Sequence, residues 1–422
     1  MPVIASLIKR SSVSDTHDPY QALRFSGFRL LLIGIFIAGL GEKMIDVAIA
    51  WELYERTGSA LVLGGVGLAL VIPVILLSLP AGHIIDHFNR KYIVIISQII
   101  LVLVSLGLTA LSFTHGSLVL IYGCLVLYGC AAAFNSPAAS TLVPQVVEEK
   151  AFENAATWDS SVGQLASVFG PALGGILIAV LGGATLVYAI NAGVVLVFVC
   201  LLFFLREIRQ AAPRLETTTL QSLGEGLKFL RSTQVILASI TLDMFAVLLG
   251  GATTLLPIYA KNILQVGPAG LGWLRAAPSL GALCMSFAIA HMPPFKRAGR
   301  TLLLAVTGFG VATIVFGISR SFWLSLLMLA FLGGFDNISV VIRSTLLMTR
   351  TPNALLGRIS AINFIFIGAS NELGGFESGL VAQFFGPVLA VAGGGIGTVL
   401  VVLLVALIWP EMRRLGAMST GV

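Results

Sequence analysis

Two carboxylates, Glu42 and Asp46, lie four residues apart inside a long apolar run. On a helix, side chains at that spacing share one face. Carboxylates that close can share a proton or hold a cation, because like charges disfavour ionisation of both groups. Lys43 lies between them and offers another interpretation, a purely structural ion pair. The sequence leaves both interpretations open.

Other polar and charged residues also interrupt apolar runs. A charge within a bilayer costs several kcal/mol unless it faces a cavity or a partner, so each one is a functional candidate. The candidates for binding a substrate or coupling its movement to a proton are Glu42, Asp46, Asp243, Asp336, Asn371 and Glu372. Because no histidine lies in the middle of an apolar run, proton coupling would have to use carboxylates.

The composition shows what must position these residues. The chain has 422 residues, of which 57% are hydrophobic and 10% charged, against about 25% charged in a soluble domain. A transmembrane helix needs about 20 apolar residues. Twelve such spans are predicted, at approximately 29–53, 60–82, 92–113, 117–140, 157–181, 184–205, 234–259, 266–291, 301–319, 322–345, 356–383 and 387–409. The predicted fold class is therefore an all-α membrane protein.

Basic residues set the expected orientation of the spans. With the N-terminus in the cytoplasm, all but five of the 25 Lys and Arg residues lie on the cytoplasmic side, as the positive-inside rule requires. The exceptions are Arg56, Lys261 and Arg320 outside, and Lys43 and Arg275 within spans. We expect a multi-pass protein of the cell (inner) membrane with both termini cytoplasmic and no cleaved signal peptide. The net charge of +6 then reflects topology and not a nucleic-acid partner.

The longest polar connection divides the chain into two halves. We predict a cytoplasmic tail at 1–28, a six-helix bundle at 29–205, a cytoplasmic linker at 206–233, a second bundle at 234–409 and a tail at 410–422. The leucine spacing in 220–230 suits an amphipathic helix on the membrane surface. The triplet at 140–142 recurs at 344–346, as expected of parallel repeats in a transporter.

The sequence predicts neither a metal site nor an enzyme. His83, Asp86 and His87 would share a helix face and could be mistaken for metal ligands, but a conformational joint between two helices is the better interpretation. The four cysteines lie in apolar runs without zinc or disulfide spacing. No P-loop signature and no nucleophile–base pair is found, and no cofactor is expected.

That joint, at 81–91, connects the second and third spans and resembles the signature of the major facilitator superfamily. The matching residues are Gly82, Asp86, Arg90 and Lys91, whereas His87 and Asn89 stand where a basic residue and a glycine are usual. The resemblance implies twelve helices in two pseudo-symmetric six-helix bundles. It also implies that the first and seventh helices line a central cavity, which ranks Glu42, Asp46 and Asp243 first among the candidates.

Further motifs narrow the resemblance. Thr351-Pro352, then Leu356-Gly357-Arg358, and the stretch at 55–60 are similar to the siderophore (enterobactin) exporter and macrolide-efflux branch. In the fifth span, an antiporter-like signature predicts a tightly packed kink, and its residues are Gly170, Pro171, Gly174 and Gly175. Ala166 and Thr157 depart from that signature. Residues 118–133 also lack the arginine that many proton antiporters of the superfamily carry there.

These features predict a secondary active exporter of a small amphipathic organic compound, a drug or a siderophore, that works by alternating access. A proton or another ion would be the coupling partner, and we expect a monomer embedded in lipid. One alternative is a carrier of an inorganic ion or a metabolite with Glu42 and Asp46 as ligands, although hard divalent cations prefer more oxygens. Another is a receptor or enzyme that retains the fold without transport.

Overall fold

The computed structural model describes residues 18–205 and 228–416, together with Gly224. Twelve long α-helices make up most of this part of the chain, and ten of them are long and apolar enough to cross a membrane. The other two, α1 and α13, are longer still, but charged and polar residues interrupt them. Helices satisfy their own backbone hydrogen bonds, which a lipid environment requires.

The described helices form two halves of six. The first half contains α1 (Ser26–Thr57), α2 (Ala60–His87), α3 (Arg90–Phe113), α4 (Leu118–Ser140), α5 (Phe152–Leu181) and α6 (Thr185–Phe204). The second contains α8 (Gln234–Leu249), α10 (Gly267–His291), α11 (Ala298–Ile318), α12 (Phe322–Arg350), α13 (Asn353–Phe385) and α14 (Pro387–Ile408). After α8, a series of short helical turns that includes α9 (Leu256–Ile258) continues to Ile263. The short helix α15 (Pro410–Arg414) follows α14. The predicted linker and its amphipathic segment lie largely outside the described residues, which resume at Lys228.

The joint between α2 and α3 is shorter than its sequence indicates. Helix α2 continues to His87 and α3 begins at Arg90, so only Phe88 and Asn89 connect them. The helix continues because Ala81 and Ile85 are buried in the core of the first half. Asn89 then caps α3 by accepting a hydrogen bond from the Lys91 amide at 3.0 Å.

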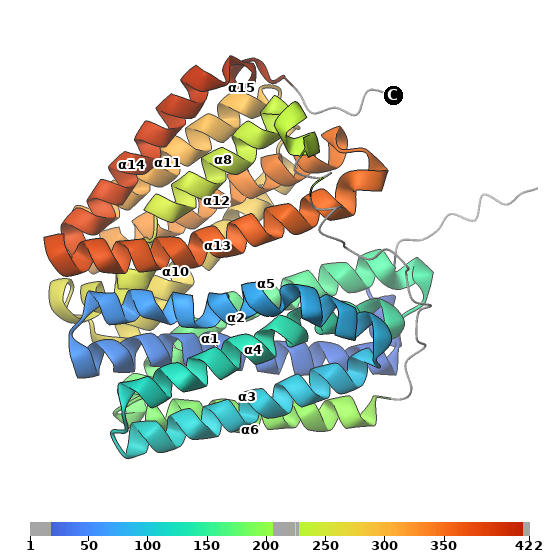
Figure 1. The fold of residues 1–422 in the computed structure, drawn as a ribbon, viewed down its shortest axis with the longest axis vertical. Helices are drawn as coiled ribbons and strands as arrows, with labels where there is room; N and C mark the ends of the chain where they lie inside the picture. The colour runs from blue at the N-terminus through green and yellow to red at the C-terminus, as the bar shows by residue number, and fades with distance from the viewer. Residues whose placement is uncertain (1–17, 206–223, 225–227, 417–422) are drawn as a thin grey trace, which may run out of the picture.

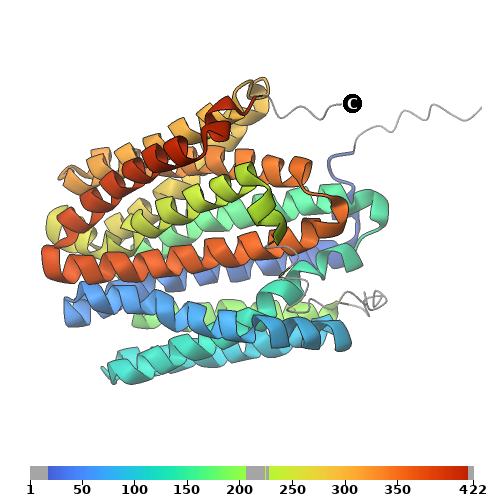
Figure 2. The same cartoon turned by 45° about the horizontal axis from the view of Figure 1, so that its top comes forward.

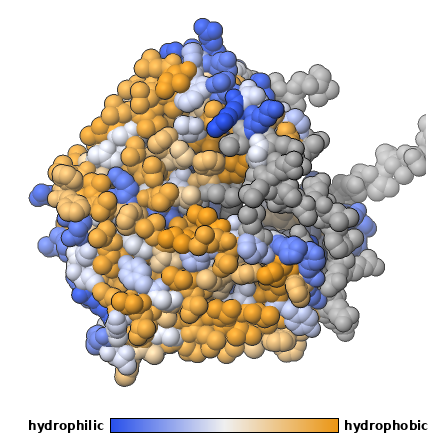
Figure 3. All heavy atoms as spheres, viewed as in Figure 1, coloured by the Kyte–Doolittle hydropathy of each residue, from blue (hydrophilic) through white to orange (hydrophobic). Residues whose placement is uncertain are grey.

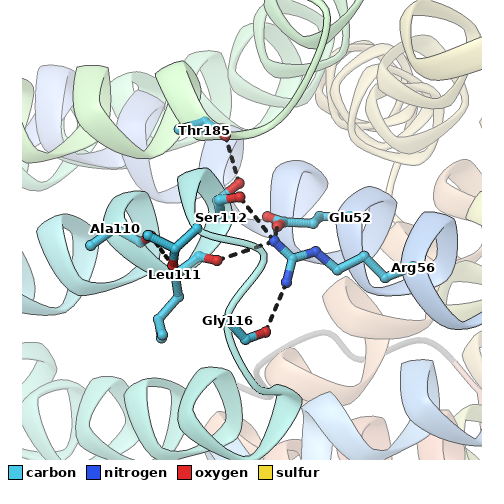
Figure 4. Close-up of polar contacts among 8 residues, drawn as sticks. Glu52, Arg56, Ala110, Leu111, Ser112, Gly116 and Thr185 are labelled. Carbon is cyan, nitrogen blue, oxygen red and sulfur yellow. Dashed lines mark hydrogen bonds and ion pairs between the residues drawn. The ribbon is translucent and has the colours of Figure 1, made fainter.

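The turn between α1 and α2 explains the motif at 55–60. Gly58 ends α1 with a φ of 60°, a left-handed conformation that favours glycine. Ser59 caps α2 by accepting a hydrogen bond from the Val62 amide. Arg56 donates hydrogen bonds to the carbonyl oxygens of Leu111, Ser112 and Gly116 and pairs with the buried Glu52 at 2.5 Å (Figure 4). Arg56 thus satisfies carbonyls at the end of α3.

The two halves are closed against each other at one end only. We call the end where α1 starts and α14 finishes the terminal end, and the end where α1 finishes and α14 starts the distal end. One apolar core runs through both halves at the distal end and includes Leu53, Leu271 and Leu274. Toward the terminal end each half has separate cores, and the helices of the two halves diverge (Figure 1).

Two helix pairs carry the contact between the halves. Helix α2 packs along α13, and α5 packs along α10. The α2–α13 pairing is visible in both ribbon views (Figure 2). The face of the bundle shown in Figure 3 is largely hydrophobic. Exposed apolar side chains such as Leu76, Phe204 and Leu407 suit contact with lipid tails.

Candidate functional site

A group of charged side chains on α1 lies close to the distal end, where the two halves are closed against each other. The Lys43 ammonium is 3.1 Å from Glu42 Oε1 and 3.7 Å from Asp46 Oδ2. The Glu42 side chain is 52% exposed and that of Asp46 is 31% exposed. In the sequence, Lys43 could have formed a purely structural ion pair with one of these carboxylates. In the structure both carboxylates share it, and both remain exposed to water.

Side chains from the second half complete this central charge cluster. Arg275 of α10 donates a hydrogen bond to the backbone oxygen of Asp46 at 3.3 Å. Glu372 of α13 lies against α2, where a Cβ atom added to Gly67 would be 2.3 Å from the Glu372 Oε2 atom. The cluster thus joins α1, α10 and α13 at the point where the halves meet. Asn371 is not part of it, since its side chain is exposed and donates to the Ile367 oxygen.

Glycines allow the helices of the two halves to touch above the cluster. A Cβ atom on Gly379 of α13 would lie 2.9 Å from the Gly64 Cα of α2. A Cβ atom on Gly175 of α5 would lie 2.8 Å from the Gly272 Cα of α10. Any larger side chain would force the backbones apart. We call these two pairs the distal seal.

Polar contacts reinforce the distal seal at its rim. Ser59 lies 3.0 Å from Gln383 across the halves. The Asn262 amide donates to the Tyr54 hydroxyl at 2.5 Å, and the Lys261 ammonium lies 5.9 Å from the Tyr54 ring centroid, within cation–π distance. Among the described residues, every hydrogen bond that joins the halves lies toward the distal end.

The antiporter-like motif on α5 lies between two partners. Gly170 and Gly174 pack on α1, where added Cβ atoms would come within 2.5 Å of Lys43 Cβ and 2.9 Å of Met44 Cα. Gly175 faces α10, as described, and Pro171 is buried inside the continuous helix. The motif therefore places the α1 charges next to the seam between the halves.

Asp243 lies elsewhere, in a buried ion pair within the second half. Its carboxylate on α8 pairs with the Arg343 guanidinium on α12, and the two residues are 5% and 3% exposed. Asp336, one of the sequence candidates, lines a small cavity beside Asp243 together with Ser339. Arg343 was not singled out in the sequence, because it lies at a span end where a basic residue reads as a topology signal. Arg343 follows Asp336 by seven residues, which places both side chains on one face of a helix, and this spacing could have pointed to Arg343.

The joint motif is partly described. Lys91 donates to the Leu205 oxygen at 2.5 Å and so caps α6. A Cβ atom on Gly82 would meet no described atom within 4 Å, so no backbone of the described residues approaches it closely. Arg90 is half-buried, and the Asp86 side chain lies outside the described part of the structure. Among the described side chains, no three His, Cys, Asp or Glu residues come together as metal ligands.

Solved structures share this arrangement. They include a POT family transporter in complex with 5-aminolevulinic acid, with a TM-score of 0.71 at 11% identity over 92% of this chain and 96% of that chain. The nucleoside transporter NupG gives a TM-score of 0.68 at 12% identity over 92% and 99%. Similarity at this level shows the fold alone. With its two six-helix bundles, the chain shares the fold of these two transporters.

Sequence relatives are more specific. The model of the transmembrane secretion effector family matches residues 17–419, and the chain belongs to that family. It is 27% identical to the multidrug efflux pump Tap of Mycolicibacterium fortuitum over 85% of this chain and 89% of that protein. It is also 27% identical to the enterobactin exporter EntS of Citrobacter koseri over 92% of each chain. These findings confirm the predicted membership of the major facilitator superfamily. They identify the protein as a transporter and not an enzyme.

Proposed function

We propose that this chain exports a small amphipathic organic compound, of the drug or siderophore type, by alternating access coupled to a proton gradient. The observation that carries the proposal is the central charge cluster, which lies below a distal seal while the halves separate toward the terminal end. A site between two halves that close at one end is what alternating access requires. The two relatives named above, a drug efflux pump and a siderophore exporter, support the substrate type.

We further propose that the terminal end faces the cytoplasm of the inner membrane. The basic residues that cluster at this end support that orientation under the positive-inside rule. The state described here is then open to the cytoplasm and ready to receive a substrate. Loosening of the distal seal would release the substrate to the outside.

The coupling residues in this proposal are the carboxylates of the central cluster. Protonation of Asp46 would remove one of the two anions that Lys43 contacts, leaving Glu42 as its partner. That change of charge occurs beside the α5 glycines and Arg275, where the halves meet. Glu372 would exchange its proton on the α13 side, and the buried Asp243, with Asp336 beside it, is a second group of coupling candidates.

The test is the pH dependence of transport in vesicles. We expect Asp46→Asn to reduce gradient-driven export at least tenfold and to flatten its dependence on pH, because the variant cannot exchange a proton there. Asp243→Asn should act in the same direction. Glu377→Gln is the matched control, since Glu377 lies near the distal end of α13 and outside the cluster. Wild-type pH dependence in both asparagine variants would show that these aspartates are structural.

A further inference from the structure

Two basic segments that are far apart in the sequence come together at the terminal end of the second half. One segment, 296–300, covers the start of α11, and the other, 410–416, contains α15. The Ala298 amide donates to the Gly416 oxygen at 3.3 Å, and α15 lies beside the start of α11 (Figure 1). We call the five cations of these segments the terminal basic patch, and they are Lys296, Arg297, Arg300, Arg413 and Arg414.

The cations of the terminal basic patch are exposed and lack acidic partners. Among the described residues, none of the five takes part in an ion pair, and Glu411 is the one acidic residue of the two segments. At the same end of the first half, Arg24 and Lys150 do pair with carboxylates, at 2.6 and 3.4 Å. Because like charges repel, the terminal basic patch would gain stability from an anion that binds to it.

Arg300 is held in a position that suits a phosphate group. Its Nε atom donates to the Arg413 oxygen at 3.4 Å, so the side chain lies against α15. Its two terminal nitrogens donate no hydrogen bond to the described residues. A guanidinium group binds phosphate through such paired N–H groups. Gly299 permits this close packing, because a Cβ atom there would overlap the Met412 backbone oxygen.

Apolar helix faces begin directly beside the patch. On α11, Leu304, Val311 and Ile318 follow Arg300 by four, eleven and eighteen residues, which places all four on one face of the helix. These three side chains are exposed, as is Leu407 on the adjacent helix α14. A positive patch at the end of lipid-facing helices lies at the level of the lipid headgroups.

Topology alone does not explain the patch. The positive-inside rule requires basic residues at one end of the helices, but it does not require them to gather at one corner. The equivalent corner of the first half lies where α3 begins beside the end of α6. There the Lys91 ammonium donates to the Leu205 oxygen, so that cation is used within the protein.

We propose that the terminal basic patch binds the headgroup phosphate of an anionic phospholipid, whose acyl chains lie along the exposed faces of α11 and α14. Arg300 would supply the paired N–H donors, and Arg413 would supply a second positive charge. The apolar faces that continue from the patch favour a lipid over a soluble anion.

The test is lipid binding to the purified full-length protein in detergent, followed by native mass spectrometry. Phosphatidylglycerol is the anionic probe and phosphatidylethanolamine the zwitterionic one. We expect the wild type to bind phosphatidylglycerol about tenfold more tightly than phosphatidylethanolamine. Arg300→Gln/Arg413→Gln should weaken phosphatidylglycerol binding about tenfold, because two charges next to the phosphate are lost, and should leave phosphatidylethanolamine binding within about twofold.

The matched control is Arg24→Gln/Lys150→Gln. It removes the same number of charges from the same end of the protein, but from cations that already have acidic partners, and it should keep the wild-type affinity for both lipids. Equal affinity of the wild type for the two lipids, or equal losses in the two double variants, would overturn the proposal and leave the patch as a topology signal.

Glycerol phosphate, the headgroup without acyl chains, distinguishes a lipid site from a simple anion site. An excess of it should not displace phosphatidylglycerol from the wild type, because the chains contribute contacts along α11 and α14. Full displacement would overturn the lipid assignment.

Discussion

Replacing Arg343 with methionine is expected to lower the free energy of unfolding by about 3–5 kcal/mol, because removal of one partner leaves the other charge buried and uncompensated. Asp243 and Arg343 are 5% and 3% exposed, and each is the ion-pair partner of the other. The change would appear as a lower midpoint of thermal unfolding for the purified protein in detergent.

The double variant Asp243→Leu/Arg343→Met is the matched control. It should recover most of the lost stability, since replacing both members of a buried pair with apolar residues of similar size is often neutral. A double variant that is stable but has lost pH-dependent export would make Asp243 a coupling residue and not only a structural one. A single Arg343→Met variant as stable as the wild type would contradict the buried pair.

Cross-linking the distal seal should stop transport completely. The side chains of Ser59 and Gln383 lie 3.0 Å apart and belong to different halves. In a chain without its four native cysteines, Ser59→Cys/Gln383→Cys would be bridged by a short bifunctional methanethiosulfonate. We expect export to fall to the background of empty vesicles, because the distal end can no longer open, and to return when a reductant cleaves the bridge.

A second cysteine pair controls for the chemistry of this experiment. Ser112 and Thr185 are in hydrogen-bond contact at 2.7 Å, also at the distal end, but both belong to the first half (Figure 4). Bridging them joins no moving parts, so export should persist. Loss of export with both pairs, or with neither, would argue against rigid movement of the two halves.

Hydrophobic patterning predicted the helices well because spans of this length leave few alternatives. The charged residues of the first span and the α5 glycines could also be recognised in the sequence, because they interrupt apolar runs. The predicted limits of the second span were wrong at its terminal end. There the polar residues around 83–87 suggested a loop, but Ile85 is buried and the helix continues to His87.

Pairings between distant helices could not be predicted from the sequence. Arg343 and Asp243 form their ion pair only because α12 packs on α8. Gly64 and Gly379 come into contact only because α2 packs on α13.

Export itself is tested most directly in inside-out vesicles that contain the full chain. Ethidium is permanently charged, so an acidic interior does not trap it without a carrier. When the vesicle interior is acidified, ethidium or a catechol siderophore should accumulate inside, and accumulation should stop when the gradient is collapsed or when Asp46 is replaced with asparagine. Accumulation of neither compound above that of vesicles lacking the protein, or accumulation only in right-side-out vesicles, would contradict a proton-coupled exporter.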